Sequence, residues 1–470
     1  MDATRQSAPA PAPVARERLL GILAALEDGL VERRPAVRLA LLVALAGEHT
    51  LLVGPPGTAK SQLARRLHLA FAEGRYFERL LTRFTVPEEL FGPLSIRALE
   101  EDRYERQTAG FLPQATIAFV DEVFKANSAI LNALLTLLNE REFDNGPRRE
   151  RCPLISVIGA TNAVPEDEVG EAFFDRFLVR LPVSPVSAPG FRALLERERA
   201  PALVPDALGE PDRAAIARAA AGVRLGDEVR ALLGEARARL GAEGLYVSDR
   251  RWVKIARLLS VAAATEGRGE ATLWDLWLLP WCTAPDAARQ AVVADWLAAR
   301  LGVREALSPP RLTRVVEAFE AQLEADRQAN DLDYDEQGRL RLGAELAAEV
   351  GDAKGGASAP RLAFTRRRLY GDAHVAARLA QLDDLLRRVD AYAAELSARR
   401  DHLAAYLDQA VWVDAEFARR ADRSLRDTVE AVRSLRGRAR GARDGFEALP
   451  RLPRDPGTVP DLVVHEPIET

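Results

Sequence analysis

The sequence predicts an α/β fold, in which a parallel β-sheet flanked by helices is followed by a helical domain and a mostly helical C-terminal region. Short apolar runs at 49–53, 117–120 and 154–158 are bounded by polar or turn residues, which is typical of buried parallel strands. Segments with helical periodicity separate these runs, and strands that alternate with helices indicate a doubly wound sheet. From about residue 190 onward the pattern is helical almost throughout.

Composition narrows the class of protein. A chain of 470 residues is too long for one hydrophobic core, so we expect about two to four domains. The net charge of -5 argues against nucleic-acid binding through a generally basic surface. No apolar run approaches the ~20 residues of a membrane helix and no secretory signal is visible, which predicts a cytoplasmic protein without membrane insertion. Cys152 and Cys282 lack disulfide or metal-ligand spacing, so we expect both to be packing residues.

The strongest local signal is a glycine-rich turn between the apolar run 49–53 and a helical stretch at 62–71. It resembles the phosphate-binding pattern GxxxxGK[ST], in which backbone N–H groups and the N-terminus of the next helix surround phosphate oxygens. We expect Lys60 to reach the β- and γ-phosphates of ATP, and the Ser61 hydroxyl to bind Mg²⁺. The predicted cofactor-binding residues of this loop are Gly54, Pro55, Pro56, Gly57, Thr58, Ala59, Lys60 and Ser61.

Ala59 departs from the pattern, because it replaces the glycine before the lysine. A left-handed backbone at this position would cost an alanine about 1–2 kcal/mol. Such a loop often turns into its helix at this point, so we expect the alanine to fit without strain.

Two carboxylates, Asp121 and Glu122, end the buried run that begins at Ile117. Ligands bind at the carboxyl ends of strands in an open α/β sheet, which would place both side chains beside the glycine-rich loop. We expect Asp121 to hold Mg²⁺ through water, and Glu122 to orient and polarise the attacking water as a catalytic residue. A solvated strand end is the alternative, and the presence of the phosphate-binding loop argues against it.

The next apolar run leads into Asn162, whose amide would hold the lytic water or contact the γ-phosphate at the same sheet edge. Arg176 follows, and we expect it to reach the γ-phosphate of a neighbouring subunit as a catalytic arginine finger. A surface ion pair with Asp175 is the alternative for Arg176. We expect Arg250 to reach back to ATP from the helical domain, at the start of a helix that Ser248 or Asp249 can cap. An arginine on the helix surface is the alternative.

Taken in this order, the motifs are similar to those of AAA+ ATPases of the MoxR family, most closely the RavA branch. The resemblance is carried by residues from about 31 to 181, and the Ala59 substitution is shared with that branch. The stretches that carry it are 54–61, 82–84, 87–95, 110–113, 137–143 and, in the helical domain, 247–252.

The resemblance implies a homohexameric ring with ATP bound between subunits. It also implies a β-hairpin inserted at about 94–106, a von Willebrand factor A domain partner, and a chaperone-like role on a protein client that the sequence does not identify. The irregular stretch 328–365 is too short for the extra domain with which RavA-type proteins dock a lysine decarboxylase, so that partner is not expected.

We divide the chain on these grounds into six parts. They are a flexible leader at 1–14, an AAA+ nucleotide-binding core at 15–190, a helical lid at 191–305, a connecting helix and irregular segment at 306–373, a long helical hairpin at 374–445, and a proline-rich, loose tail at 446–470. The hairpin carries apolar residues in steps of three and four, which fit an exposed arm, three-helix packing or self-association equally well.

Three other functions stay open from the sequence. The first is an ATP-gated scaffold with slow turnover, and the second is a metal-insertion motor similar to that of magnesium chelatase. The third is a DNA-processing motor, for which the basic runs at 366–368 and 433–443 are the only hints; solvated helix faces explain these runs better. The aromatic residues Trp274, Trp277 and Trp281 recur at helical spacing and indicate lid core rather than a docking face.

Overall fold

The computed structural model describes residues 13–72, 74–163, 168–196, 204, 206–301, 303–329, 368–455 and 457–468. The chain forms two compact units, the first made of Met1–Leu301 with Leu403–Ala421, and the second of Gly302–His402 with Asp422–Thr470. Residues 1–12 of the predicted leader, and 330–365 of the predicted irregular segment, lie outside the described part of the chain.

A five-stranded sheet in the order β2-β3-β6-β1-β7 forms the centre of the first unit. Every neighbouring pair of strands is parallel, which confirms the predicted fold class. Consequently the carboxyl ends of the strands meet at one edge of the sheet. The strands are β1 (His49–Val53), β2 (Tyr76–Leu80), β3 (Ile117–Asp121), β6 (Ser156–Thr161) and β7 (Phe177–Pro182).

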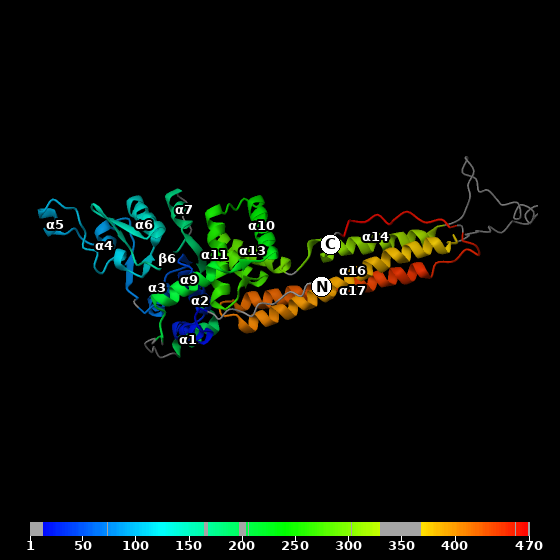
Figure 1. Ribbon diagram of the computed structural model, residues 1–470, viewed down its shortest axis with the longest axis horizontal. Coiled ribbons are helices and arrows are strands. Elements are labelled where there is room, and N and C mark those ends of the chain that lie inside the picture. Colours follow the sequence, from blue (N-terminus) through cyan, green and yellow to red (C-terminus); the bar gives the residue numbers. More distant parts are fainter. Residues whose placement is uncertain are drawn as a thin grey trace, which may run out of the picture. The chain divides into compact units, whose positions relative to one another are not determined.

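Helices cover both faces of this sheet (Figure 1). On one face, α6 (Ser128–Glu140) and α7 (Glu168–Phe174) pack over a buried cluster that includes Leu51, Ala118 and Val120. The other face is covered by α2 (Arg34–Leu45) and α3 (Lys60–Leu67), and α1 (Arg16–Glu27) packs beside them. Because side chains alternate across each strand, the two buried faces explain why these strands are apolar along nearly their whole length.

The prediction of a β-hairpin at 94–106 is wrong, because this segment contains the short helix α5 (Ile96–Glu100). Ser95 caps the helix by accepting a hydrogen bond from the Ala98 N–H, and a single antiparallel bridge joins Leu94 to Arg106. A hairpin forms instead after α6, from β4 (Glu142–Asn145) and β5 (Arg148–Arg151). The remaining helix of this region is α4 (Pro87–Phe91).

The rest of the first unit is mainly helical. Trp274 and Trp277 are buried, in agreement with the prediction that they form core, whereas Trp281 is half-buried. The helices are α8 (Ala188–Leu195), α9 (Glu210–Ala221), α10 (Asp227–Ala242), α11 (Asp249–Thr265), α12 (Leu279–Thr283) and α13 (Ala287–Arg300). A small parallel pair of strands, β8 (Arg224–Leu225) and β9 (Glu270–Ala271), lies among them.

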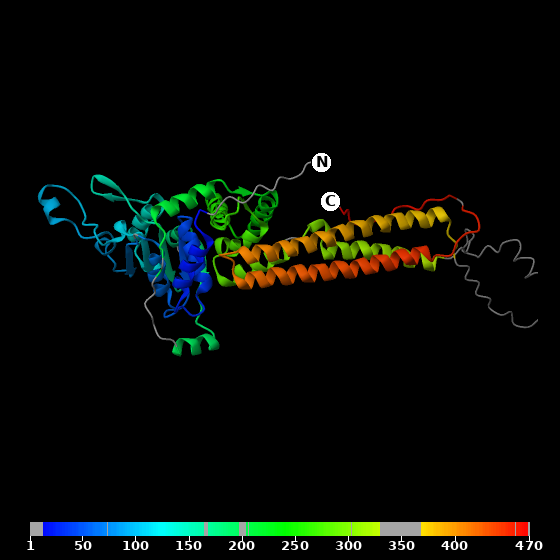
Figure 2. The same cartoon turned by 60° about the horizontal axis from the view of Figure 1, so that its bottom comes forward.

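Two long helices, α16 (Asp372–Gln409) and α17 (Ala415–Glu447), pass from one unit to the other. In the second unit they lie side by side with α14 (Pro309–Gln328), as the two ribbon views show (Figure 2). The ion pair between Arg438 and Glu320 at 2.6 Å joins α17 to α14. Of the three arrangements compatible with the sequence, three-helix packing is therefore the one observed, with Leu382, Leu385, Val389, Tyr392 and Leu396 all buried.

The C-terminal segment, expected to be a loose tail, is bound to this bundle. The Arg314 side chain forms an ion pair with Glu466 at 2.8 Å, and Arg378 donates a hydrogen bond to the Asp461 carbonyl at 2.6 Å. Val463 is also buried against the bundle. Among the helices that the structure describes, none is both long and apolar enough to cross a lipid bilayer.

Candidate active site

The loop between β1 and α3 has the backbone of a phosphate cradle. Gly54 is required by close packing, because a Cβ atom there would lie 2.1 Å from the Val183 carbonyl oxygen. Gly57 has a φ of +77°, a left-handed conformation that glycine adopts readily, and no atom lies within 4 Å of a Cβ built there. The open space beside Gly57 leaves room for a ligand. Ala59 has φ 66° and ψ 24°, which corrects the expectation that this alanine fits without strain. The left-handed conformation costs it about 1–2 kcal/mol.

Lys60 lies inside this loop and is almost fully buried. Its ammonium donates hydrogen bonds to the carbonyl oxygens of Gly54 at 2.7 Å and Pro55 at 2.9 Å. Burial lowers the pKa of Lys60, and the negative charges of Asp121 and Glu122 oppose that shift. The two carboxylates are thus close enough to act on the loop lysine, as the sequence predicts.

Glu122 and Asn162 meet at the carboxyl edge of the sheet. The Asn162 amide Nδ2 donates a hydrogen bond of 2.6 Å to Glu122 Oε1, and the Lys125 ammonium lies 3.3 Å from Glu122 Oε2. Glu122 itself has a φ of 51°, a left-handed backbone that is costly for a non-glycine residue and is typical of functional sites. Asp121 Oδ1 accepts a hydrogen bond of 3.0 Å from the backbone N–H of Glu122, which orients the Asp121 carboxylate.

The oxygen donors near the loop suit Mg²⁺ rather than a transition metal. Ser61 lies in the first turn of α3 and Asp121 ends β3, so a hydroxyl and a carboxylate are available. Within the described ranges no group of three or more His, Cys, Asp or Glu side chains could hold a metal ion by itself. Mg²⁺ is commonly bound by one or two protein oxygens together with phosphate oxygens and water, and this site offers that set.

Arg176 lies at the opposite edge of the sheet, immediately before β7. The register pairs His49 with Phe177 and Val53 with Pro182, so a strand length separates Arg176 from the phosphate-binding loop of the same chain. At about 3.3 Å per residue this distance is beyond the reach of an arginine side chain. The Asp175 carboxylate, the alternative partner of Arg176, lies 3.8 Å from the Arg176 guanidinium. The same carboxylate lies closer to the Arg251 guanidinium, at 3.1 Å.

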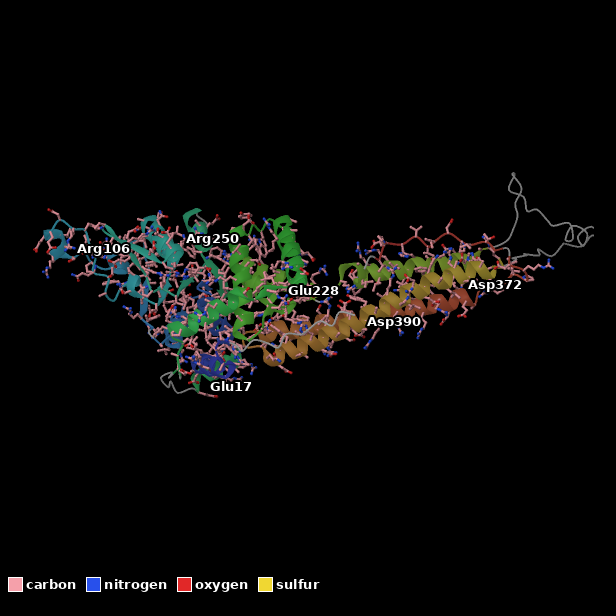
Figure 3. The ribbon with its side chains drawn as sticks, in the orientation of Figure 1. Glu17, Arg106, Glu228, Arg250, Asp372 and Asp390 are labelled. Atoms are coloured by element: carbon pink, nitrogen blue, oxygen red, sulfur yellow. The ribbon has the colours of Figure 1, made fainter. Side chains whose placement is uncertain are left out.

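Arg250, which is labelled in Figure 3, lies close to Arg176 at the sheet edge where β1 begins. This placement corrects the expectation that Arg250 reaches back to the ATP of its own chain. It is exposed at the start of α11, and its guanidinium donates a hydrogen bond of 2.7 Å to Asn139 Oδ1 near the end of α6. Burial and the positive charge of Arg250 both lower the pKa of Arg176. The structure therefore brings the two predicted arginines together, but apart from the other predicted residues.

Arg251 is an important residue that the sequence did not single out. It is buried, and its guanidinium donates to the carbonyl oxygens of Cys282, Phe177 and Leu178 as well as to Asp175. These bonds attach α11 to the start of β7, which Arg176 immediately precedes. Sequence alone cannot separate Arg250 from Arg251, because their opposite environments depend on contacts distant along the chain.

A cavity of about 400 Å³ lies near the loop, although none of residues 54–61 lines it, and it was also not predicted. Arg33 connects the two, because it lines the cavity while its guanidinium donates hydrogen bonds to the Thr58 carbonyl at 3.1 Å and the Ser184 carbonyl at 2.7 Å. The other residues that line the cavity include Trp277, Trp281, Gln290 and Phe417.

Comparison with protein-family models matches residues 17–203 to the MoxR domain in the MoxR-vWA-beta-propeller ternary systems, and residues 228–297 to an AAA lid domain. Two proteins of uncharacterised function from Methanocaldococcus jannaschii are 42% and 43% identical over 258 residues. These matches span 54% of this chain and 67% and 68% of the two relatives.

Two further likenesses are more distant. Protein MoxR of Paracoccus denitrificans is 30% identical over 181 residues, which cover 37% of this chain and 52% of that protein. A solved structure of a candidate ATPase from Cytophaga hutchinsonii covers 56% of this chain and 84% of its own, with a TM-score of 0.47 and 19% identity.

Proposed function

Because the chain belongs to the MoxR family of AAA+ ATPases, we propose that it binds ATP with Mg²⁺ at residues 54–61 and hydrolyses it to ADP and phosphate. The observation that carries this proposal is the contact between Glu122 and Asn162 at the same sheet edge as Lys60. Phosphoryl transfer needs mainly positioning and charge stabilisation, and these groups supply both.

Each residue has a distinct role in this proposal. Lys60 and the N–H groups of the loop hold the β- and γ-phosphates, and Ser61 and Asp121 hold Mg²⁺, the latter through water. Bound Mg²⁺ neutralises part of the charge that develops on the phosphate oxygens. Glu122 accepts a hydrogen bond from the attacking water, and the Asn162 amide fixes the direction of the carboxylate.

Arg176 and Arg250 act on the nucleotide of a neighbouring subunit. They lie at the sheet edge opposite their own phosphate-binding loop, so only a second copy of the chain can bring a γ-phosphate to them. This arrangement supports assembly into a closed ring, which we propose to be a homohexamer. Arg176 supplies the positive charge of an arginine finger, and Arg250 binds the same nucleotide from the lid.

We further propose a von Willebrand factor A domain partner and a protein client that the ring remodels in the cytoplasm. The matched family model is described by its occurrence with vWA and β-propeller proteins, which supports the first of these partners. The residues 247–252 support placement nearest the RavA branch, as the sequence suggested. Nucleic acid is not part of this proposal.

ATP turnover by the purified full chain, alone and with a vWA protein encoded nearby, tests the proposal. Lys60→Ala should abolish nucleotide binding, whereas Glu122→Gln should retain binding and lose nearly all hydrolysis. Turnover at the wild-type rate in Glu122→Gln would overturn the assignment of the water-activating carboxylate. ATP binding without turnover in either preparation would favour the ATP-gated scaffold instead.

A further inference from the structure

A second cavity, of about 660 Å³, lies at the edge of the sheet opposite the phosphate-binding loop. Thr116 and Ile155, which line this cavity, immediately precede β3 and β6, whereas Asp121 ends β3 on the side of the loop. The five residues of β3, at about 3.3 Å each, therefore separate the cavity from the candidate active site. Its volume lies in the range of small-molecule sites.

Arginine side chains dominate the charge of this cavity. Arg75, Arg141 and Arg151 line it, together with Arg213 and Glu210, which form an ion pair with each other. In the part of the chain that the structure describes, none of the first three guanidinium groups has a carboxylate partner at ion-pair distance. Three positive charges thus surround the cavity without a counter-charge, although charged groups in a fold are normally paired.

Arg141 is the most constrained of the three. It directly follows α6 with φ 58° and ψ 32°, a left-handed backbone that glycine or asparagine usually supplies at a helix end. Its guanidinium donates to the carbonyl oxygens of Gly47 at 2.7 Å and Ile155 at 3.3 Å. Burial lowers the pKa of Arg141 to about 10, and the negative charge of Glu48 opposes that shift. Because Glu48 is itself paired with Lys254 at 2.5 Å, the positive charge of Arg141 stays in excess.

The other two arginines extend from a backbone that is fixed by hydrogen bonds. The Arg75 N–H donates to Thr116 Oγ1 at 2.7 Å, and this hydroxyl donates to the Arg75 carbonyl at 3.0 Å. Arg151 ends β5, and the N–H of the next residue, Cys152, donates to the Arg141 carbonyl at 2.7 Å. Both arginine side chains are exposed, so they can turn toward a ligand while their backbone stays in place.

This lining suits an oxyanion that carries several negative charges. A guanidinium presents parallel N–H donors that match two oxygen atoms of a phosphate group. A single carboxylate would balance only one of the three charges, whereas a polyphosphate or a bisphosphate can balance all of them. Buried side chains of Phe71, Leu154 and Leu208 also line the cavity, and they offer apolar surface to the organic part of a phosphate ester.

From these observations we propose that the cavity is a second anion site, which binds a multiply charged phosphate compound. Arg75 and Arg151 donate hydrogen bonds to its oxygen atoms from the exposed side, and Arg141 supplies positive charge from the buried side. The inference does not depend on the proposed ATPase function, because none of residues 54–61 lines this cavity.

Isothermal titration of the full chain at fixed ionic strength tests this proposal, with Lys60→Ala as background to remove phosphate binding at the nucleotide loop. Inorganic tripolyphosphate and fructose 1,6-bisphosphate are the two probes, and they represent the inorganic and the ester forms of the ligand. The variants are Arg141→Met and the double variant Arg75→Met/Arg151→Met. The double variant changes exposed side chains only, so it stays informative if thermal unfolding shows that Arg141→Met is not folded.

The matched control is Arg97→Met/Arg148→Met, which removes two positive charges from exposed arginines that do not line the cavity. At least one probe should bind to the parent with one molecule per chain, and the tighter of the two identifies the form of the ligand. The double variant should raise the Kd of that probe by roughly tenfold or more, because charge-assisted hydrogen bonds to phosphate are lost. Arg141→Met should raise it as well, Arg141→Lys should raise it less, and the control should leave it within about twofold.

An equal Kd in the double variant and in the control would overturn the inference, because binding would then reflect net charge alone. Binding of neither probe to the parent would overturn it too. If a glutamate-rich peptide bound with the same dependence on these arginines and neither phosphate probe did, the cavity would accept carboxylates of a protein partner, and its assignment to phosphate would be wrong.

Discussion

Asn162 Nδ2 donates a hydrogen bond of 2.6 Å to Glu122 Oε1, joining the ends of two strands that the sequence separates widely. The bond occupies one carboxylate oxygen and leaves the other beside the Lys125 ammonium. Asn162 is thus a positioning residue for Glu122 in addition to any contact that it makes with water or phosphate.

The first prediction concerns this bond. Asn162→Ala should lower kcat by roughly 10²-fold, because a freely rotating Glu122 spends less time aimed at the attacking water. The Kd for ATP should change little. Steady-state turnover together with equilibrium binding measures both quantities. A loss of binding that matches the loss of turnover would show that Asn162 acts on the nucleotide instead.

The second prediction concerns subunit contacts. Arg176→Ala should reduce turnover by about 10³-fold or more, since an arginine finger contributes that much to phosphoryl transfer. Because Arg176 is proposed to serve a neighbour, mixing inactive Arg176→Ala with inactive Glu122→Gln should restore part of the activity. Some mixed interfaces then combine an intact carboxylate with an intact arginine. If every mixture stays as inactive as its components, Arg176 does not act between subunits.

The third prediction separates two adjacent arginines. Arg251→Met should destabilise the fold by about 3–5 kcal/mol, because it leaves several buried carbonyl groups and Asp175 without their donor. Arg250→Met is the matched control, because replacing an exposed side chain changes the free energy of unfolding by no more than about 0.5 kcal/mol. This variant should nevertheless lower turnover. Chemical denaturation and ATPase assays of the two variants give the comparison. If the two variants had the same free energy of unfolding, the structural role of Arg251 would be contradicted.

The fourth prediction concerns backbone strain in the phosphate-binding loop. Ala59→Gly should stabilise the protein by about 0.5–1 kcal/mol, because relief of the left-handed penalty exceeds the entropy that glycine adds to the unfolded chain. Thermal unfolding without nucleotide measures this change. Ala64→Gly, in the helix that follows, is the control and should be destabilising. A lower Tm for Ala59→Gly would mean that the strain is relieved in solution.

The fifth prediction concerns pH. His49 is fully buried, and its Nδ1 accepts a hydrogen bond of 2.9 Å from the Val157 N–H. Burial, and then the positive charges of Arg141 and Lys254, hold its pKa well below the ordinary value of 6.5. As the pH falls below 6.5, the unfolded chain takes up a proton that the folded chain does not.

The contribution of His49 to the free energy of unfolding should therefore be fully present above pH 6.5. Below that pH the free energy of unfolding should decline, by up to about 1.4 kcal/mol per pH unit from this residue. Urea unfolding at pH 7.5 and 5.5 measures the decline, which should be smaller in His49→Gln. The same decline in both proteins would show that other groups cause it.

The sequence predicted the elements whose signals are local. The run 49–53 is β1, and the order of the phosphate-binding loop, Asp121, Glu122 and Asn162 was enough to place these residues at one sheet edge. Strands β2 and β7 were not predicted, because charged residues such as Glu78 and Arg180 interrupt their apolar pattern. In the fold, Arg180 stacks on the Phe174 ring at 3.9 Å, a contact with no signal along the chain.

Other features could not be predicted because they depend on distant segments. Ser95 and the residues after it favour a helix, but the family resemblance suggested a hairpin, and local capping prevailed. The position of Arg250 relative to Asn139, and the wall that Phe417 adds to the cavity, each join segments far apart in sequence. Periodicity gives the buried face of a helix and does not identify the neighbour that covers it.

The turn between α16 and α17 has a consequence for cutting the protein into parts. Residues Leu403–Ala421 belong to the same unit as the phosphate-binding loop, although about a hundred residues separate them from Leu301. A fragment that stops at Leu301 would leave Thr265, Glu266 and Asp275 without Trp412, Val411 and Tyr406, at about 1–3 kcal/mol for each buried group. The first unit is therefore discontinuous in the gene, and neither a single stop codon nor a single proteolytic cut can release it whole.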